Sequence, residues 1–377
     1  MPNLLLEEDH FLKIVPVILD PSVPPAHIHA VADFFAHDVP DFLGWCERLR
    51  ARIPGLYPAE VIWARDQADF LAKLPAADGA IVESLVVDRT ALAAGARLKV
   101  VHKFGTLGSN IDAAACAERG VAVVFLHRHV NVAVAEQCVT LMLALAKRIS
   151  ALDGLVDRAA LAAAGYDIRP RAPGYIGYSN YARVAGLKTL HGATLGIVGL
   201  GEVGREVARR AAAFGMSTLY HQRRPLAATD EPALGARYVS LGDLMAQSDY
   251  IVVQLPLNET TRGIIDADAL RGVKPGAYLV NCARAELVDR DALVAALDSG
   301  RLGGLALDVG YDEPAQPDDP LLRFRGRPNV ILMPHTAIAA RQNALSDLER
   351  LCVNLWRAIT SQGGRAAAKN PITSTPS

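Results

Sequence analysis

Cysteine is scarce in this sequence, and its spacing excludes two kinds of site. Only five cysteines occur among 377 residues, and no pair has the C-x-x-C spacing. Zinc sites and disulfide frameworks show more regular cysteine patterns, so we expect neither a bound metal nor disulfide bonds. A reduced, cytoplasmic setting is the plain interpretation. The cysteines are Cys46, Cys116, Cys138, Cys282 and Cys352.

The sequence also lacks an excess of positive or negative residues, and it lacks long apolar runs without charged residues. The formal net charge is −1, which gives no electrostatic reason to expect nucleic acid or a membrane surface as a partner. The sequence has no charge-free run of about 18 apolar residues, which is the pattern that would predict a membrane span. The first residues, MPNLLLEEDHF, are too acidic for a signal peptide. With 51% hydrophobic residues, the chain can form one large or two ordinary globular domains.

The most informative stretch covers residues 194–212, TLGIVGLGEVGREVARRAA. An apolar run ends in the pattern G-x-G-x-x-G, formed by Gly199, Gly201 and Gly204, and residues at helical spacing follow. A strand, a glycine turn and a helix in this order form the dinucleotide-binding fingerprint. The turn lets the backbone approach a pyrophosphate, and the helix N-terminus offers N–H groups to its oxygens. Glu202 and Val203, inside the turn, belong to this predicted cofactor site.

The rest of the chain alternates between predicted strands and predicted helices, which is typical of parallel α/β sheets. Residues 1–10 are interpreted as a short arm, and 131–148 as a buried helix between two domains. Residues 151–185 contain helix breakers and four tyrosines, and are expected to be irregular. The final helix is predicted over 341–359. Strands are expected at 12–19, 60–64, 79–83, 98–104, 121–125, 194–198, 218–221, 250–255, 277–281, 304–308 and 330–333.

The residues after the second strand of the glycine-turn sheet bear on cofactor choice. In NAD-binding sheets an acidic residue about 20 positions beyond the fingerprint binds the ribose hydroxyls. Here Gln222, Arg223 and Arg224 stand in this region, with no carboxylate. A neutral side chain and two guanidinium groups would accommodate a 2′-phosphate, so NADP(H) is favoured over NAD(H).

Three polar residues follow the ends of later predicted strands, where ligands bind in open α/β sheets. They are Arg284, Glu313 and His335. An arginine can hold the carboxylate of a 2-oxoacid with both branches of its guanidinium group. A histidine can supply a proton to the new alkoxide, and a neighbouring glutamate favours its protonated form. The set therefore points to hydride transfer between a nicotinamide cofactor and a small 2-oxoacid.

These motifs together resemble the D-isomer-specific 2-hydroxyacid dehydrogenases, the group that includes glyoxylate/hydroxypyruvate reductases. The resemblance covers roughly residues 78–355 and rests on the glycine turn, the NCAR segment, the LDVxxxEP segment and Pro334-His335. It implies that Arg284 binds and polarises the substrate, that His335 is the acid/base and that Glu313 tunes it. It also implies a place near the nicotinamide for Asp308. Further cofactor contacts implied by the resemblance are Leu255, Pro256, Cys282 and Ala283.

The resemblance extends to a substrate loop within residues 103–112. Lys103 belongs to this expected substrate site, and the backbone N–H groups of Leu107 and Gly108 would meet the substrate carboxylate. Leu107 stands where a glycine is common, which would narrow the pocket, and Ala285 replaces another common glycine. The segment 151–185 is longer than expected, and its tyrosines either line the mouth of the active site, extend a dimer contact, or have no role.

The resemblance also implies two doubly wound parallel-sheet domains, with a Rossmann cofactor domain inserted into a flavodoxin-like substrate domain. The expected substrate domain is 1–127 with 337–365, the cofactor domain is 128–336, and 366–377 is a disordered tail. Family members are commonly homodimers joined through the cofactor domain.

Other activities on the same fold remain open at this stage. Formate dehydrogenases share the fold and the arginine but carry glutamine at the position of Glu313, and phosphite oxidation is related. Some relatives act as nucleotide-sensing co-repressors that bind cofactor and partner peptides. The leading interpretation is a cytoplasmic reductase of small 2-oxoacids, such as glyoxylate or hydroxypyruvate, that uses NADPH.

Overall fold

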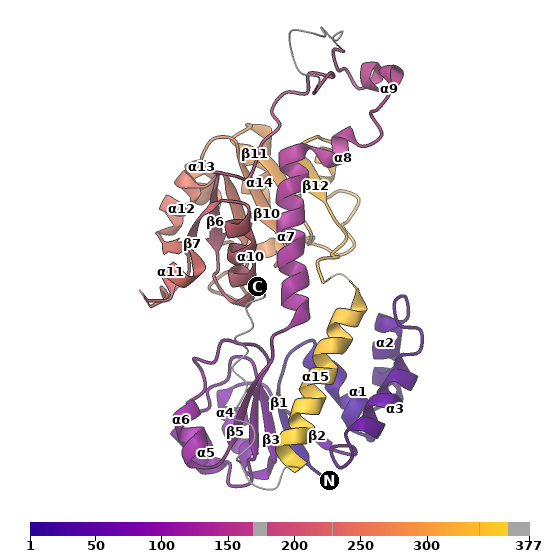
Figure 1. Cartoon of the computed structure of the whole chain (residues 1–377), viewed down its shortest axis with the longest axis vertical. Helices are drawn as coiled ribbons and strands as arrows, with labels where there is room; N and C mark the ends of the chain where they lie inside the picture. Colours follow the sequence, from indigo (N-terminus) through magenta and orange to yellow (C-terminus); the bar gives the residue numbers. More distant parts are fainter. Residues whose placement is uncertain (169–178, 228, 339, 361–377) are drawn as a thin grey trace. The chain divides into compact units, whose positions relative to one another are not determined.

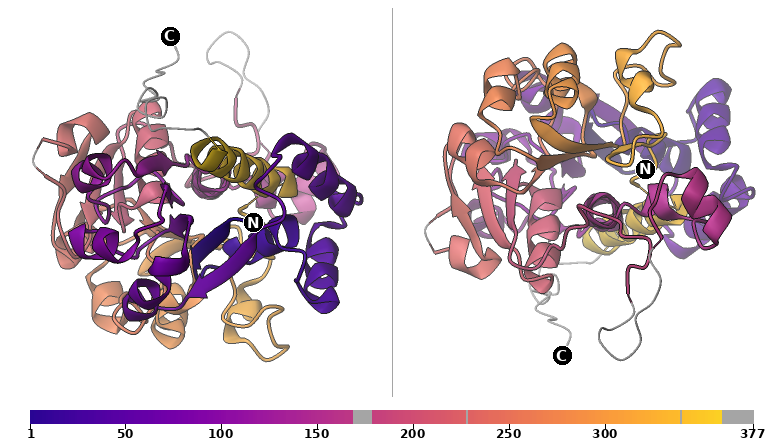
Figure 2. Two further views of the ribbon diagram at one scale, coloured as in Figure 1. Left: turned by 90° about the horizontal axis from the view of Figure 1, so that it is seen from below. Right: turned by 90° about the horizontal axis from the view of Figure 1, so that it is seen from above.

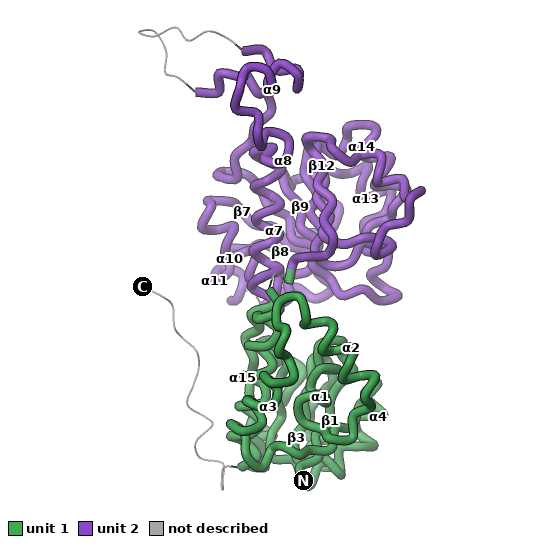
Figure 3. Tube along the Cα trace, turned by 90° about the vertical axis from the view of Figure 1, so that its right-hand side faces the viewer, with its two compact units in different colours: residues 1–130, 338–377 green, residues 131–337 purple. Residues whose placement is uncertain are grey.

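The computed structural model describes residues 1–168, 179–227, 229–338 and 340–360. The chain divides into two compact units (Figure 3). Unit 1 consists of residues 1–130 and 338–377, and unit 2 of residues 131–337. Each unit contains one sheet in which every recorded strand pair is parallel. The predicted α/β class with two parallel sheets is confirmed.

The sheet of unit 1 has five strands in the order β2-β1-β3-β4-β5, the flavodoxin-like arrangement. Its helices cover both faces, and α15 packs on β4 (Figures 1 and 2). The strands are β1 (Asn3–Glu7), β2 (Glu60–Ala64), β3 (Gly79–Val82), β4 (Val100–Lys103) and β5 (Ala122–Phe125). The helices are α1 (Val15–Leu19), α2 (Pro25–Phe35), α3 (Phe42–Arg52), α4 (Gln67–Lys73), α5 (Arg89–Ala94), α6 (Ala113–Glu118) and α15 (Arg341–Thr360).

The sheet of unit 2 has seven strands in the order β12-β11-β10-β9-β6-β7-β8. Counted from β6, this is the Rossmann order with one further strand at an edge. The strands are β6 (Thr194–Val198), β7 (Ser217–His221), β8 (Ala236–Tyr238), β9 (Tyr250–Val253), β10 (Ala277–Asn281), β11 (Leu302–Leu307) and β12 (Val330–Leu332). The helices are α7 (His129–Lys147), which begins in unit 1, α8 (Ile149–Leu152), α9 (Arg158–Ala163), α10 (Glu202–Ala213), α11 (Glu231–Leu234), α12 (Leu241–Gln247), α13 (Ala267–Gly272) and α14 (Arg290–Asp298).

Two expectations at the N-terminus are wrong. Residues 12–19 are helical, because a short 3₁₀ turn runs into α1, and residues 3–7 form β1, a strand with neighbours on both sides. A short apolar run does not distinguish a buried strand from a buried helical turn. Pro16 decides the matter here, because it lacks the N–H that a sheet needs and fits the first turn of α1.

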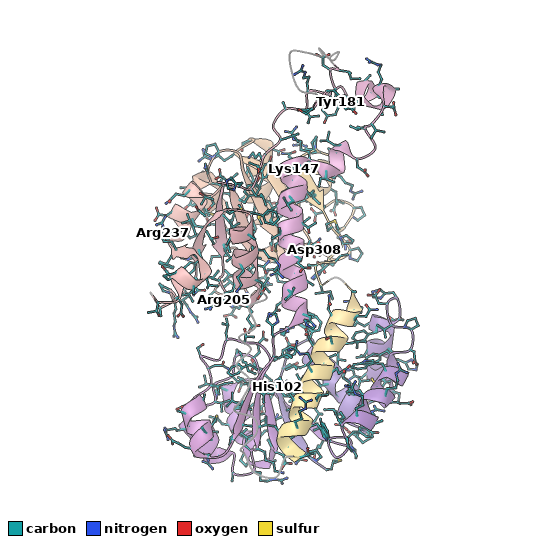
Figure 4. The ribbon with its side chains drawn as sticks, viewed as in Figure 1. His102, Lys147, Tyr181, Arg205, Arg237 and Asp308 are labelled. Atoms are coloured by element: carbon teal, nitrogen blue, oxygen red, sulfur yellow. The ribbon has the colours of Figure 1, made fainter. Side chains whose placement is uncertain are left out.

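The segment 151–185 is less irregular than expected, since it contains α9. Its small apolar core consists of Leu161, Ala182 and Val184, with Tyr166 packed against it. Tyr181, labelled in Figure 4, donates a hydrogen bond to the carbonyl oxygen of Val156 at 3.4 Å. Tyr175 and Tyr178 lie outside the described residues, as does the predicted tail 366–377.

Helix α7 is long and apolar enough to cross a membrane by length and composition, but 56% of that stretch is buried inside the structure. Its polar side chains are used within unit 2. Asn131 donates a hydrogen bond to Glu202 at 2.7 Å, and Gln137 donates one to Asp308 at 3.4 Å. Glu136 forms an ion pair with Arg210 at 3.3 Å. These contacts are those of a core helix that packs on the Rossmann sheet.

His102, on β4, is fully buried on the face of the unit 1 sheet that α15 covers (Figure 4). The side-chain amide of Asn354 donates to its Nε2 at 3.4 Å, so the ring is a neutral acceptor there. Burial lowers the pKa of His102 to about 4. Protonation would place a buried charge against another donor, which is unfavourable.

This arrangement predicts acid-sensitive stability. The folded-state pKa lies below the unfolded value of about 6.5, so the unfolded chain binds the proton first as the pH falls. The stabilisation is complete above pH ~6.5 and is lost toward pH ~4. By pH 5 the wild type should lose about 2 kcal/mol of unfolding free energy from this group. Urea unfolding at pH 7.5 and pH 5 should show this loss, and His102→Leu should lack it. The control His37→Leu, at an exposed histidine, should retain it, and an equal loss in all three proteins would contradict the assignment.

Candidate active site

The glycine turn connects β6 to α10, and its geometry explains two of its glycines. Gly199 has a φ of +101°, and a Cβ there would lie 2.4 Å from the carbonyl oxygen of Gln254. A Cβ on Gly204 would lie 2.3 Å from the carbonyl oxygen of Gly199. Larger residues are therefore excluded at both positions.

Gly201 has a different role in the same turn. It caps the N-terminus of α10 without a side chain, and a Cβ there would meet no atom within 4 Å. Open space beside the N–H groups of the first helical turn suits a pyrophosphate, so the residues present fit a dinucleotide. The Glu202 carboxylate accepts the hydrogen bond from Asn131, and the backbone of 202–203 begins the helix.

Strand β7 ends at His221, and the residues that follow carry no carboxylate over 222–227. The side-chain amide of Gln222 donates to the carbonyl oxygen of Arg224 at 2.6 Å, which tightens this turn. Arg223 and Arg224 are both exposed. Two guanidinium groups are thus available beside the end of the second Rossmann strand.

The structure brings the three predicted polar residues to neighbouring strands. Arg284 follows β10, Glu313 follows β11 and His335 follows β12, and these strands are adjacent and parallel. Their loops therefore meet at one edge of the sheet. His335 Nδ1 lies 2.8 Å from Glu313 Oε2. Both side chains are partly open to solvent, with exposed fractions of 37% and 45%.

Both carboxylate oxygens of Glu313 have a hydrogen-bond partner, which fixes the side chain in this contact. The backbone N–H of Gly310 donates to Oε1 at 2.9 Å, while Oε2 faces His335. Partial burial opposes ionisation of the carboxyl, but the hydrogen bonds from His335 and Gly310 and the charge of Arg284 outweigh it and lower the pKa of Glu313. The Glu313 carboxylate therefore stays ionised at pH values below the ordinary range for a glutamate, and its negative charge faces the His335 ring.

Arg284 is exposed, and its Nη1 donates to the carbonyl oxygen of Ala283 at 2.7 Å. The side chain of Asn281 supports this loop, since it donates to the carbonyl oxygen of Arg284 and accepts from the N–H of Ala283. Other guanidinium donors of Arg284 stay available for a ligand.

Asp308 is fully buried, and its carboxylate is held by the backbone of the residues that follow His335. One carboxylate oxygen accepts from the N–H and hydroxyl of Thr336, and the other accepts from the N–H of Ala337 at 2.8 Å. Gln137 of α7 donates a hydrogen bond to the same carboxylate, and Asp308 is labelled in Figure 4. Asp308 thus fixes the backbone that directly follows His335.

The residues expected to form the walls of the cofactor cleft lie at the ends of β9 and β10. Leu255 is half-buried beside the glycine turn, and Pro256 is exposed. Cys282 is buried, and Ala283 is half-buried. A hydrogen bond with the Cys138 thiol raises the pKa of Cys282, and burial raises it further. The Cys282 thiol therefore stays protonated and behaves as a small apolar side chain.

The predicted substrate loop belongs to unit 1, whereas Arg284, Glu313 and His335 belong to unit 2. Lys103, at the end of β4, is buried and donates to the carbonyl oxygen of Glu83. Leu107 and Gly108 are half-buried, and a Cβ on Gly108 would collide with the Phe125 ring.

Comparison with known proteins agrees with this geometry. Residues 139–337 match the model of the D-isomer-specific 2-hydroxyacid dehydrogenase NAD-binding domain. The chain is 34% identical over 271 residues to a glyoxylate reductase of Korarchaeum cryptofilum, which covers 71% of this chain and 75% of that protein. It is 31% identical over 296 residues to glyoxylate/hydroxypyruvate reductase B of Yersinia pseudotuberculosis, with 78% and 85% covered.

Solved structures show the same relationship. The PH0520 protein from Pyrococcus horikoshii aligns over 95% of this chain and 92% of its own, with a TM-score of 0.57 and 25% identity. A glyoxylate reductase from Paecilomyes thermophila aligns over 95% of both chains, with a TM-score of 0.54 and 27% identity. The resemblance inferred from the motifs is thereby confirmed: this chain belongs to the D-isomer-specific 2-hydroxyacid dehydrogenases and is an NAD(P)-dependent dehydrogenase.

Proposed function

We propose that this dehydrogenase reduces small 2-oxoacids such as glyoxylate or hydroxypyruvate, with a D-hydroxyacid as product where a stereocentre forms. The observation that carries the proposal is the 2.8 Å contact between His335 and Glu313, on strands next to the one that presents Arg284. The similarity to glyoxylate and hydroxypyruvate reductases supports this choice of substrates.

In this proposal each side chain has one task. The Arg284 guanidinium binds the substrate carboxylate and polarises the adjacent carbonyl. The nicotinamide, when bound, supplies the hydride. His335 donates the proton from Nε2 to the new alkoxide oxygen, because its Nδ1 is directed to Glu313. Glu313 keeps the ring oriented through its contact with Nδ1.

The direct test is oxidation of the reduced cofactor with glyoxylate and with hydroxypyruvate, compared for NADPH and NADH. Turnover with either acid is the expected result. Reduction of NADP⁺ or NAD⁺ by formate or phosphite, without activity toward 2-oxoacids, would replace the proposal with those activities. Tight cofactor binding without any turnover would favour a nucleotide-sensing role.

We also propose that NADPH is preferred, on the basis of the turn after β7. The basic residues Arg223 and Arg224 and the absence of a carboxylate over 222–227 support a site for the 2′-phosphate. Gln222→Asp would add a ribose acceptor and would repel the phosphate. The ratio of kcat/KM for NADPH to that for NADH should fall about 10- to 100-fold.

The matched control is Gln247→Asp, because Gln247 is exposed at the end of α12. That variant has the same charge change and should keep the wild-type ratio. If Gln222→Asp also kept it, the turn after β7 would not be the phosphate site.

A cytoplasmic homodimer joined through the cofactor domain completes the proposal. All five cysteines are free thiols and buried, which supports a reduced setting. Analytical ultracentrifugation of the full chain would give the oligomeric state directly.

A further inference from the structure

Arg205 is a partly buried cation of unit 2 that the proposed mechanism does not use. It follows Gly204 directly, near the start of α10, and is labelled in Figure 4. Its Nε is buried and has no partner, and among the residues that the structure describes its side chain forms no hydrogen bond or ion pair. A buried donor on a charged group is costly to leave unpaired, so an external acceptor would stabilise it.

The other two arginines of the same helix are paired, which sets Arg205 apart. Arg209 Nη1 lies 2.5 Å from Glu206 Oε1, and Arg210 Nη1 lies 2.7 Å from Glu206 Oε2. Arg210 also forms an ion pair with Glu136 of α7 at 3.3 Å. Arg205 is thus the arginine of α10 whose guanidinium donors stay available for a ligand.

Two carboxylates near the start of α10 are engaged with other groups. The Glu202 carboxylate accepts a hydrogen bond from the side-chain amide of Asn131 at 2.7 Å. The Glu231 carboxylate accepts from the Tyr220 hydroxyl at 2.8 Å and from a backbone N–H of β8 at 3.2 Å. Both carboxylates therefore support the local structure and do not satisfy Arg205.

The electrostatic surroundings of Arg205 leave its charge only partly compensated. Burial is the largest effect and lowers the pKa of Arg205, and the positive charge of Arg209 acts in the same direction. The negative charges of Asp230 and Glu202 act in the opposite direction but do not cancel the effect of burial. An anionic group bound beside Arg205 would therefore stabilise the charged guanidinium further.

The turn after β7 lies next to the helix that carries Arg205. Helix α10 packs on β7 and on α11, and the turn joins these two elements (Figure 1). The Tyr220 hydroxyl, on β7, accepts from the N–H of Leu226 at 2.8 Å, so the turn folds back over the end of its strand. Tyr220 and Asp230, at the two ends of the turn, both interact electrostatically with Arg205. Arg205 is therefore beside the turn whose residues bear on cofactor choice.

A dinucleotide with a 2′-phosphate would bring negative charge to two places near Arg205. The pyrophosphate would take the N–H groups at the start of α10, in the open space beside Gly201. The adenosine ribose would reach the end of the second Rossmann strand, where an arginine accommodates a 2′-phosphate in NADP-binding sheets. Because backbone N–H groups serve the pyrophosphate, the unpaired guanidinium of Arg205 is left for the second anionic group.

We propose that Arg205 binds the 2′-phosphate of NADPH, together with the exposed Arg223 and Arg224 of the turn after β7. This inference rests on the proposed preference for NADPH. A planar guanidinium can engage two phosphate oxygens at once. A partly buried side chain also loses less conformational freedom on binding than an exposed one, so more of its interaction energy is available for affinity.

The test is isothermal titration calorimetry of the full chain with adenosine 2′,5′-bisphosphate and with adenosine 5′-monophosphate, which lacks only the 2′-phosphate. In Arg205→Gln, the dissociation constant for the bisphosphate should rise about 10- to 150-fold, and that for the monophosphate should change by less than about threefold. Arg205→Lys keeps the charge without the planar fork, so its loss should be smaller. The matched control is Arg209→Gln, which removes an exposed arginine from the same helix and should leave both dissociation constants unchanged.

The remaining outcomes separate the possible failures. If the wild type prefers the bisphosphate and Arg205→Gln keeps that preference, the inference is overturned and the proposed NADPH preference stands. Equal losses for both ligands would also overturn it, and a lower Tm without rescue by lysine would identify the role of Arg205 as structural. A wild type without preference for the bisphosphate would overturn the NADPH preference and the inference together. Reduction of 2-oxoacids with NADH would in that case still support the proposed substrates.

Discussion

Replacing His335 by glutamine is expected to lower kcat for glyoxylate reduction by about 10²- to 10⁴-fold, the usual contribution of a positioned general acid. Glutamine can hydrogen-bond to Glu313 but cannot donate a proton to an alkoxide at neutral pH. His335 lies at the end of the Rossmann sheet, apart in sequence from the glycine turn, so cofactor affinity should change little. Stopped-flow hydride transfer and fluorescence titration with NADPH measure the two quantities separately.

Glu313→Gln is the companion variant, because Glu313 acts through His335. The lowered pKa of Glu313 means that its carboxylate is charged throughout the neutral range. Without that charge the His335 ring loses its carboxylate partner at Nδ1, so kcat for glyoxylate reduction should fall, by less than in His335→Gln. Near-normal turnover in His335→Gln would refute the acid/base assignment, whatever the behaviour of the glutamate variant.

Replacing Arg284 by glutamine should produce the other large loss, in kcat/KM for every 2-oxoacid. Two charged hydrogen bonds to a carboxylate contribute about 1.5–3 kcal/mol each, which corresponds to about 10²- to 10⁴-fold. Arg284→Lys keeps the positive charge but lacks the planar fork, so its loss should be smaller. Initial-rate kinetics with glyoxylate and hydroxypyruvate measure both effects.

The control for this series is Arg271→Gln, which changes an exposed arginine on α13 of the same unit. Its kcat/KM should match the wild type. If Arg284→Gln lost less than a few-fold, the substrate carboxylate would have to be held by other groups, and the role assigned to the loop after β10 would be abandoned.

The parallel α/β class was readable from the sequence because buried parallel strands form apolar runs that alternate with helices. Six strands were expected in the cofactor sheet, and the structure has seven. The additional strand, β8, has three residues, one of them Arg237, and is too short to show a pattern. The same limit explains the N-terminal errors, since the apolar runs of β1 and α1 are both short, and the clearest difference between them is Pro16, which only α1 contains.

The sequence predicted which residues of the candidate site follow the ends of strands, but not the contacts that they make. The order of strands in a parallel sheet brings Arg284, Glu313 and His335 to one edge, and their spacing in the sequence reveals that they follow strands. The sequence could not reveal contacts that depend on loop conformation, such as the Gly310 N–H on Glu313 or the carboxylate of Asp308 on residues 336–337.

The backbone of His335 has a consequence for the balance between stability and activity. Its φ of +54° places a residue with a Cβ in the left-handed region, which costs about 1 kcal/mol or more. Glycine would adopt this conformation freely, so an inactive His335→Gly protein should resist unfolding at least as well as the wild type. The proposed role of His335 in proton transfer and the stability of its backbone therefore favour different residues at this position.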